Sequence, residues 1–295
     1  DNVQKGGSPI DYEIVCRYVN YIGSDVITID VPIALFEMET EDRNWQKFEP
    51  CDLRIPSGMV RNAAIQFIKE NQSFNELYGA DMVSRLVAGH EGSQTNDKYN
   101  GKHIAFVPLP SLNRSGNADG WIRRVLMVGY GCETEDARKL FDDLTSALHG
   151  RAIYDNKKQI GVLRRTKSED KDNVLRLFIG KDKRYKVWRT VTPIVLTGMM
   201  RRGRSVEDLV VRALKQSGIE PEYVDSIATF RGPIVPKTFH ALDYHVRGYL
   251  EKTGRFHAEI IFKKPVIGPL ILGRGRYSGF GLMMAWAESP PKDLQ

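Results

Sequence analysis

Cysteine is scarce in this sequence, and its placement excludes the frameworks of cysteine-rich proteins. Among 295 residues there are only three cysteines, Cys16, Cys51 and Cys132, and no two of them form a C-x-x-C pair. A disulfide-stapled fold or a cysteine-based zinc site is therefore not expected, and the thiols fit a reducing cytoplasm. We expect them to be structural.

Long apolar runs and leader-like features are missing too. No window approaches the roughly 18 consecutive apolar residues of a membrane span, so we expect none. The first residues lack a signal-peptide pattern. The sequence begins with Asp1 rather than Met, which suggests a processed or truncated chain with an upstream domain removed.

Motifs for a bound metal or cofactor are also missing. The sequence has no H-E-x-x-H motif and no acidic cluster typical of a two-metal nuclease, and no Walker Lys-Ser/Thr follows the glycines near its C-terminus. We therefore expect neither a metal nor a cofactor, although carboxylates that are distant in sequence can converge in a fold.

Positive charge is concentrated in one stretch. The formal net charge is +6, yet residues 151–204 alone hold 16 Lys/Arg against 5 Asp/Glu. The rest of the chain is therefore net negative. Such a concentration favours a polyanionic partner, and the alternative is a solvated basic surface without a partner.

Apolar spacing in the first half predicts the order β-α-β-β-α-β. Its clearest helix has one apolar face and is followed by Gly150 as a C-terminal cap. The expected helices are Met59–Lys69 with Ser57 as its N-cap, Asn75–Ala88 and Glu133–His149. The expected strands are Val31–Met38, His103–Val107 (stopped by Pro108 and Pro110), Trp121–Gly129, Gln159–Arg164 and Val174–Ile179.

The second half repeats this plan less completely. A capping box at Ser205–Asp208 predicts a helix that ends at Gly218, and a further helix over Phe239–Leu250 has weaker support. The expected strands are Trp188–Leu196, Tyr223–Phe230, Arg255–Phe262, Val266–Leu272 and Gly279–Trp286. We predict an α+β protein with tandem ferredoxin-like (RRM-like) domains. The expected boundaries are 1–30 for an N-terminal extension, 31–185 and 186–289 for the two domains, and 290–295 for a tail.

A glycine-rich loop near the C-terminus has three interpretations. Residues 268–281 hold five glycines together with Arg274 and Arg276. A G-x-G nucleotide loop needs a following helix, but only 14 residues follow Gly281 and they include two prolines. A tight turn between two strands is the second interpretation. The third, which we favour, is a loop whose bare backbone and arginines approach an RNA backbone, while Tyr277 and Phe280 stack on bases.

A series of short motifs resembles a known family. The motifs are Gly89-His90, His103–Pro110 with Ala118–Gly120, Thr192–Leu196, and Val266–Gly273 with Arg276-Tyr277. In this order, over roughly residues 31–287, they are similar to the CRISPR-associated RAMP superfamily. They most resemble the type I-G (formerly I-U) subunit that fuses a Cas-five-like domain to a Cas-six-like domain. One departure is Thr197-Gly198, where the family tends to have Asp-Arg.

The resemblance implies a metal-independent endoribonuclease that binds and cuts CRISPR repeat RNA (pre-crRNA) to give mature crRNA. It also implies an upstream Cas-five-like domain and other effector-complex subunits as partners. The alternative within the superfamily is a non-catalytic RNA-binding subunit that caps the guide RNA. A third hypothesis is a nucleotide-dependent enzyme that uses the glycine-rich loop.

Metal-free RNA cleavage needs a general acid and a general base, and histidine titrates near neutral pH. We predict His90, His103 and His257 as candidates. His90 follows a helix end, His103 opens a strand across the same loop, and His257 lies on the polar side of an alternating strand. The alternative for His90 is an ordinary loop histidine, and the alternative for His103 is a strand-edge residue satisfied by the backbone. His149 is explained by the dipole at its helix C-terminus.

Residues for RNA contact are predicted from charge and from the loop. They are Gly273, Arg274, Gly275, Arg276 and Tyr277 of the loop, Arg201, Arg202 and Arg204 before a helix N-terminus, and Lys263 and Lys264 before the loop.

Overall fold

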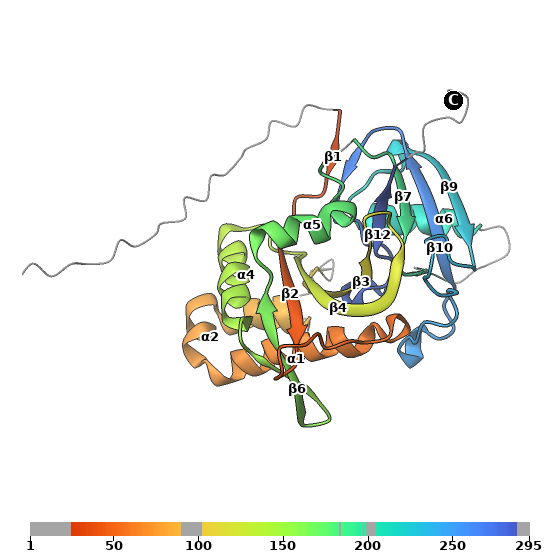
Figure 1. Cartoon of the computed structure of the whole chain (residues 1–295). Helices are drawn as coiled ribbons and strands as arrows, with labels where there is room; N and C mark the ends of the chain where they lie inside the picture. Colours follow the sequence, from red (N-terminus) through yellow and green to blue (C-terminus); the bar gives the residue numbers. More distant parts are fainter. Residues whose placement is uncertain (1–24, 90–101, 183, 197, 199–204, 288–295) are drawn as a thin grey trace, which may run out of the picture.

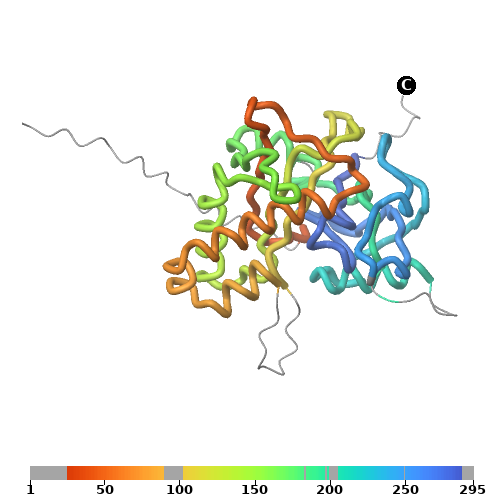
Figure 2. Tube along the Cα trace, turned by 90° about the horizontal axis from the view of Figure 1, so that it is seen from below, coloured from red at the N-terminus to blue at the C-terminus, as the bar shows by residue number. Residues whose placement is uncertain are grey.

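The computed structural model describes residues 25–89, 102–182, 184–196, 198 and 205–287. Within them the chain forms two antiparallel sheets side by side, with the first half of the sequence on one side and the second half on the other (Figures 1 and 2). Among the helices in these ranges, none combines the length and the apolar character needed to cross a membrane.

The first sheet has the strand order of a ferredoxin-like unit. Its order is β3-β4-β2-β6-β5, and every neighbouring pair is antiparallel. The strands are β2 (Ile33–Glu39), β3 (Ile104–Leu112), β4 (Ala118–Gly129), β5 (Ala152–Asp155) and β6 (Lys158–Arg165). Between β2 and β3 lie α1 (Arg54–Glu70), α2 (Gln72–Tyr78), α3 (Ala80–Val83) and the π-helical turn η2 (Ser84–Ala88). Helix α4 (Glu135–Leu148) follows β4 and is capped by Thr134.

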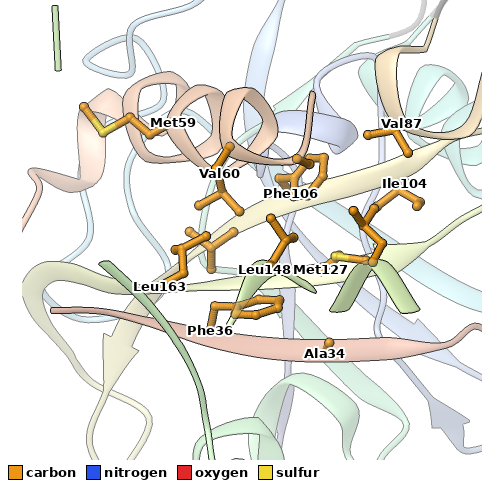
Figure 3. Packing of buried hydrophobic residues seen from close by; sticks show 14 of the residues in the cluster. Ala34, Phe36, Met59, Val60, Val87, Ile104, Phe106, Met127, Leu148 and Leu163 are labelled. Carbon is orange, nitrogen blue, oxygen red and sulfur yellow. The ribbon is translucent and has the colours of Figure 1, made fainter. Parts of the chain in front are cut away.

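One face of this sheet is covered by α1 and α4. Figure 3 shows the packing, in which Met59 and Val60 of α1 and Phe36 and Phe106 of the strands belong to one buried cluster between the helix and the sheet. Burying each large apolar side chain stabilises the fold by about 1.5–3 kcal/mol. The opposite face packs against α5 (Ser168–Ile179) and the second half, through Leu35 and Leu126 on one side and Leu282 and Met284 on the other.

The second sheet repeats the ferredoxin strand order. Its strands are β7 (Val187–Thr190), β8 (Ile194–Val195), β9 (Val224–Phe230), β10 (Arg255–Phe262) and β12 (Met283–Trp286). Strand β10 pairs with β9 on one side and with β7 and β8 on the other, and β12 pairs with β7. Helix α6 (Val206–Gln216) begins at the predicted capping box of Ser205 and Asp208. Short strands β1 (Ile27–Thr28) and β11 (Val266–Ile267) pair in parallel. The prediction of tandem ferredoxin-like units is confirmed.

The glycine-rich loop takes the place of the second crossover helix in this half. Between β10 and β12 the described chain has only β11 and the turn η5 (Arg276–Ser278). Two further short turns, η1 (Pro50–Asp52) and η3 (Pro221–Tyr223), precede α1 and β9. The helix expected over Phe239–Leu250 is wrong, because this segment forms turns and ends in the short helix η4 (Gly248–Leu250).

Several other predicted elements were wrong in type or extent. Residues 174–179 form the end of helix α5, with Leu175 and Phe178 buried one helical turn apart. Strand β3 continues through Pro108 and Pro110, which is tolerated because β3 lies at the edge of its sheet, where a missing N–H costs no ladder bond. Ser57 lies inside α1 instead of capping it.

The last predicted elements were too long. Trp188–Leu196 is interrupted between β7 and β8, and Val266–Leu272 and Gly279–Trp286 contain only the short strands β11 and β12. The single helix expected over Asn75–Ala88 is divided at Gly79, whose φ of 78° is left-handed. The break between β7 and β8 faces the loop described next.

Candidate RNA-binding site

The glycine-rich loop is anchored to the break between β7 and β8. The N–H of Arg274 donates to the carbonyl of Val195 at 2.9 Å, and the N–H of Gly281 donates to the carbonyl of Pro193 at 2.9 Å. The buried Thr192 hydroxyl donates to the carbonyl of Gly279 at 2.6 Å and accepts the N–H of Leu282 at 3.0 Å. The Thr192–Leu196 motif therefore fixes the path of the loop.

The glycines of this loop are enclosed by the protein itself. A Cβ on Gly273 or Gly281 would overlap the carbonyl oxygen of Val195 or Leu272. A Cβ on Gly275 would lie 2.7 Å from Phe280, and one on Gly279 would lie 2.7 Å from the ring of Pro108. The glycines thus permit tight packing within the chain, as the structural interpretation of the loop requires. Gly273 and Gly275 are buried, whereas Arg274 between them is exposed.

A cationic pocket of about 320 Å³ lies between this loop and α1. We call it the arginine pocket, after its four arginines: Arg54, Arg61, Arg247 and Arg274. Its described lining also holds Ser57, His103 and Tyr277 but no aspartate or glutamate. Four positive charges without a neutralising carboxylate in the lining give the pocket the chemistry of an anion site.

Helix α1 supplies one wall of this pocket. Arg54, Ser57 and Arg61 recur at helical spacing and so lie along one stripe of the helix. Arg54 donates through Nη1 to the carbonyl of Val246 at 3.1 Å, and Arg61 donates through Nη2 to the carbonyl of Ala88. The buried Nε of Arg61 has no partner in the part of the chain that the structure describes. Burial, followed by the charge of Arg247, lowers the pKa of Arg61.

His103 lies at the end of the arginine pocket near Arg61. Its imidazole stacks on the ring of Tyr277, with the ring centroids 3.6 Å apart and an interplanar angle of 19°. On Gly89, a Cβ would lie 3.2 Å from three atoms of the same imidazole. Arg276 donates through Nη2 to the Tyr277 hydroxyl at 3.0 Å and lies 4.7 Å from the ring centroid. The His103 ring is therefore held by the loop and by the end of η2.

Tyr277 and Phe280 differ from the expectation that both stack on bases. His103 covers a face of Tyr277, and Phe280 is only 1% exposed and packs in the core of the first half. Neither ring offers an open surface comparable to that of Arg274. In this loop the aromatic residues serve packing, and Arg274 is the exposed side chain.

Among the described residues, Lys263 and Lys264 do not line this pocket. His90, Arg201, Arg202 and Arg204 lie outside the described residues. Lys263 and Lys264 follow the C-terminal end of β10. The loop is anchored near the N-terminal end of β10, where the N–H of Leu196 donates to the carbonyl of Gly254. Lys264 lies 5.6 Å from the ring of Tyr223. Across eight residues at about 3.3 Å each, the two ends of β10 are far apart.

His257 is fully buried rather than on a polar face. Its Nε2 lies 2.9 Å from the carbonyl oxygen of Phe239, and its Nδ1 lies 3.1 Å from the hydroxyl of Thr190. A carbonyl only accepts, so Nε2 carries the proton and Nδ1 accepts from Thr190. Both nitrogens are occupied, and we leave His257 out of the proposed catalytic set.

The buried His257 predicts a loss of stability in acid. Burial lowers its pKa to about 4, so between pH 6.5 and 4 the unfolded chain binds a proton that the folded chain does not. The stabilisation is present above about pH 6.5 and is lost as the pH falls, by about 2 kcal/mol between pH 7 and pH 5. Urea unfolding at pH 7 and at pH 5 should show that His257→Gln removes this loss of unfolding free energy between the two pH values. The exposed His149→Gln is the control and should keep it; an unchanged difference in His257→Gln would contradict the assignment.

Sequence reasoning missed three of the four pocket arginines. Arg54, Arg61 and Arg247 come from segments far from the loop in sequence. The spacing of Arg54, Ser57 and Arg61 was a usable signal, but the helix was expected to begin only at Met59. Arg247 lies in a stretch without regular structure, and no pattern in the sequence connects it to α1.

Two ferredoxin-like units, with a glycine-rich loop of the second beside the first helix of the first, define the architecture of this chain. The family model of the CRISPR-associated protein GSU0054 family matches residues 74–285. The chain belongs to this family of CRISPR-associated proteins. No curated protein sequence matches it.

Solved structures with similar folds include CRISPR-associated Cas6 proteins. One has a TM-score of 0.41 at 10% identity over 88% of this chain and 100% of its own. A Cas6 product complex has a TM-score of 0.41 at 10% identity over 86% and 99%. A Cas6-related protein from Pyrococcus furiosus has a TM-score of 0.37 at 12% identity over 88% and 100%. Because these scores are below 0.5, we take the fold from the strand pairing.

Proposed function

We propose that this chain binds CRISPR repeat RNA and cuts it to mature crRNA as a metal-independent endoribonuclease. The observation that supports this most is the position of His103 inside a pocket with four arginines and no carboxylate in its described lining. Arginines attract a phosphodiester, and a histidine beside it exchanges protons at neutral pH.

In this mechanism the RNA supplies its own nucleophile. A general base takes the proton of a ribose 2′-hydroxyl, and the oxygen attacks the adjacent phosphorus. The bond to the 5′-oxygen breaks, and a general acid protonates that oxygen. The products are a 2′,3′-cyclic phosphate and a 5′-hydroxyl. We assign one proton transfer to His103 and propose His90, which follows Gly89 in the sequence, for the other.

The arginines stabilise charge on the phosphorane that forms during attack. Burial, followed by the charge of Arg247, lowers the pKa of Arg61, and both side chains line the pocket, so a dianionic phosphorane in the pocket offsets their repulsion. Positioned donors of this kind act most strongly where charge develops in the transition state. Arg274 is exposed on the loop, and we assign it to RNA binding.

We also propose that the chain corresponds to the Cas-six-like part of the type I-G fused subunit, acts in the cytoplasm, and contacts other effector-complex subunits. The motif series from Gly89-His90 to Arg276-Tyr277 supports this. The second candidate function is a non-catalytic subunit that caps the guide RNA. It is favoured by the fact that His103 is the only histidine in the described lining of the pocket.

One assay separates the two candidate functions. The chain is incubated with repeat RNA in EDTA, beside the same RNA carrying a 2′-deoxyribose at the cut. We expect cleavage of the first RNA and none of the second, with a cyclic phosphate on the upstream product. Cleavage that needs a divalent metal, or that survives the 2′-deoxy substitution, contradicts the mechanism. Tight binding without cleavage favours the capping subunit.

A further inference from the structure

A second cavity lies on the other side of the His103–Tyr277 stack. It has a volume of about 230 Å³, somewhat below the range of about 300–1,000 Å³ for drug-sized ligands. Tyr277 lines both this cavity and the arginine pocket. The turn η5 therefore separates two neighbouring cavities, with Arg274 on one side and Arg276 on the other.

The lining of the second cavity is partly apolar and carries hydrogen-bonding groups. Ile29 and Ile219 supply apolar surface, and Tyr130 lies edge-on to Tyr277 with the ring centroids 6.0 Å apart. Thr28 and Gln216, whose side chains are exposed, also line this cavity and bring a hydroxyl and an amide group to it. Within the described residues, no hydrogen bond engages either group. Hydroxyl and amide groups both donate and accept, as the edges of nucleobases do.

Charge distinguishes the two cavities. The second cavity has two carboxylates, and each is paired: Asp30 with Arg138 at 3.0 Å and Glu133 with Lys102 at 2.6 Å. Arg276 is engaged with the Tyr277 hydroxyl. A phosphate is therefore drawn to the arginine pocket, and a neutral planar group with polar edges fits the second cavity.

We propose that the second cavity holds the base of a nucleotide whose phosphate lies in the arginine pocket. In a nucleotide, phosphate and base are joined through one ribose, and here the two sites are joined through one residue, Tyr277. A base turned out of its stack into such a cavity is a common means by which proteins recognise single-stranded RNA. This inference rests on the proposed function, because it requires RNA in the arginine pocket.

The test couples a change in the RNA to a change in the cavity. After the cut is mapped, an abasic ribose replaces the nucleotide on either side of it. Dissociation constants are measured for the wild-type chain and for Gln216→Leu, which removes a hydrogen-bonding group from an exposed position. For one of the two abasic RNAs we expect binding to the wild type to weaken by about tenfold, and binding to Gln216→Leu to weaken by less than about threefold.

Two controls keep the result specific. Gln72→Leu makes the same substitution at an exposed position on α2 and should keep the full tenfold loss. Thr28→Trp fills the cavity from β1 and should remove the loss by a different route. An equal abasic penalty in the wild type and both cavity variants overturns the inference while the proposed function stands. Failure of the wild type to bind the intact RNA overturns both.

Discussion

Replacing His103 by alanine is expected to slow cleavage of repeat RNA by roughly 10²–10⁴-fold, the usual contribution of a general acid or base. The imidazole is the only side chain in the described pocket lining that ordinarily titrates near neutral pH. RNA affinity should change little, because the arginines that bind phosphate remain. Single-turnover cleavage rates and dissociation constants, measured on the same RNA, separate these two effects.

One control variant should keep cleavage, and a second set of variants should lower RNA affinity. His149→Ala changes an exposed histidine after α4 and should leave cleavage unaffected.

Arg247→Ala with Arg274→Ala should weaken RNA binding. The slope of log K against log salt concentration should become shallower by about 0.7 for each phosphate of a single strand that is no longer neutralised. His90→Ala should also slow cleavage. Full activity in both the His90 and the His103 variants would place the chemistry elsewhere.

Replacing Gly281 by alanine is expected to destabilise the fold by about 2–5 kcal/mol. Its φ is 71°, where a side chain is strained, and its Cβ would overlap the backbone oxygen of Leu272. The same residue donates to Pro193 at 2.9 Å and accepts from Leu272 at 3.0 Å, so relief of the overlap would disturb both bonds. Urea unfolding measures the loss.

Gly150→Ala is the matched control for this substitution. Gly150 has a φ of 80°, yet a Cβ there would meet no atom within 4 Å. Its variant therefore carries only the conformational cost, about 1–2 kcal/mol. The difference between the two variants isolates the contact between the loop and Leu272. Equal stability of the two would mean that the loop is not packed as tightly as described.

Most of the order of elements could be predicted from the sequence, but the types of two elements, residues 174–179 and 239–250, could not. Spacing identified α4, the capping box of α6 and the alternation of β10 because each depends on neighbours along the chain. Residues 174–179 were misassigned because an apolar run of this length fits either a strand or a buried helix. The acidic first turn at Glu169 and Asp170, and Gly180 at the end, were the available signals for a helix.

The site was less predictable, since its residues meet only in three dimensions. The sequence drew attention to the loop, but it favoured glycines that approach RNA, whereas their open sides are filled by Pro108, Val195 and other parts of the chain. His257 looked polar by alternation, yet that side of β10 is covered by the turn that holds Phe239. The alternation of polar and apolar residues along a strand does not tell which of its two faces another segment of the chain will cover.

The arginine pocket also has a consequence for how the protein unfolds. Its walls come from α1 and β3 in one half and from the loop and Arg247 in the other, and the two halves share the core that joins Leu35 and Leu126 to Leu282 and Met284. Neither half can open without exposing that core to water. The pocket therefore assembles cooperatively with the whole molecule, and under the proposed function an RNA that contacts both walls stabilises the entire folded chain.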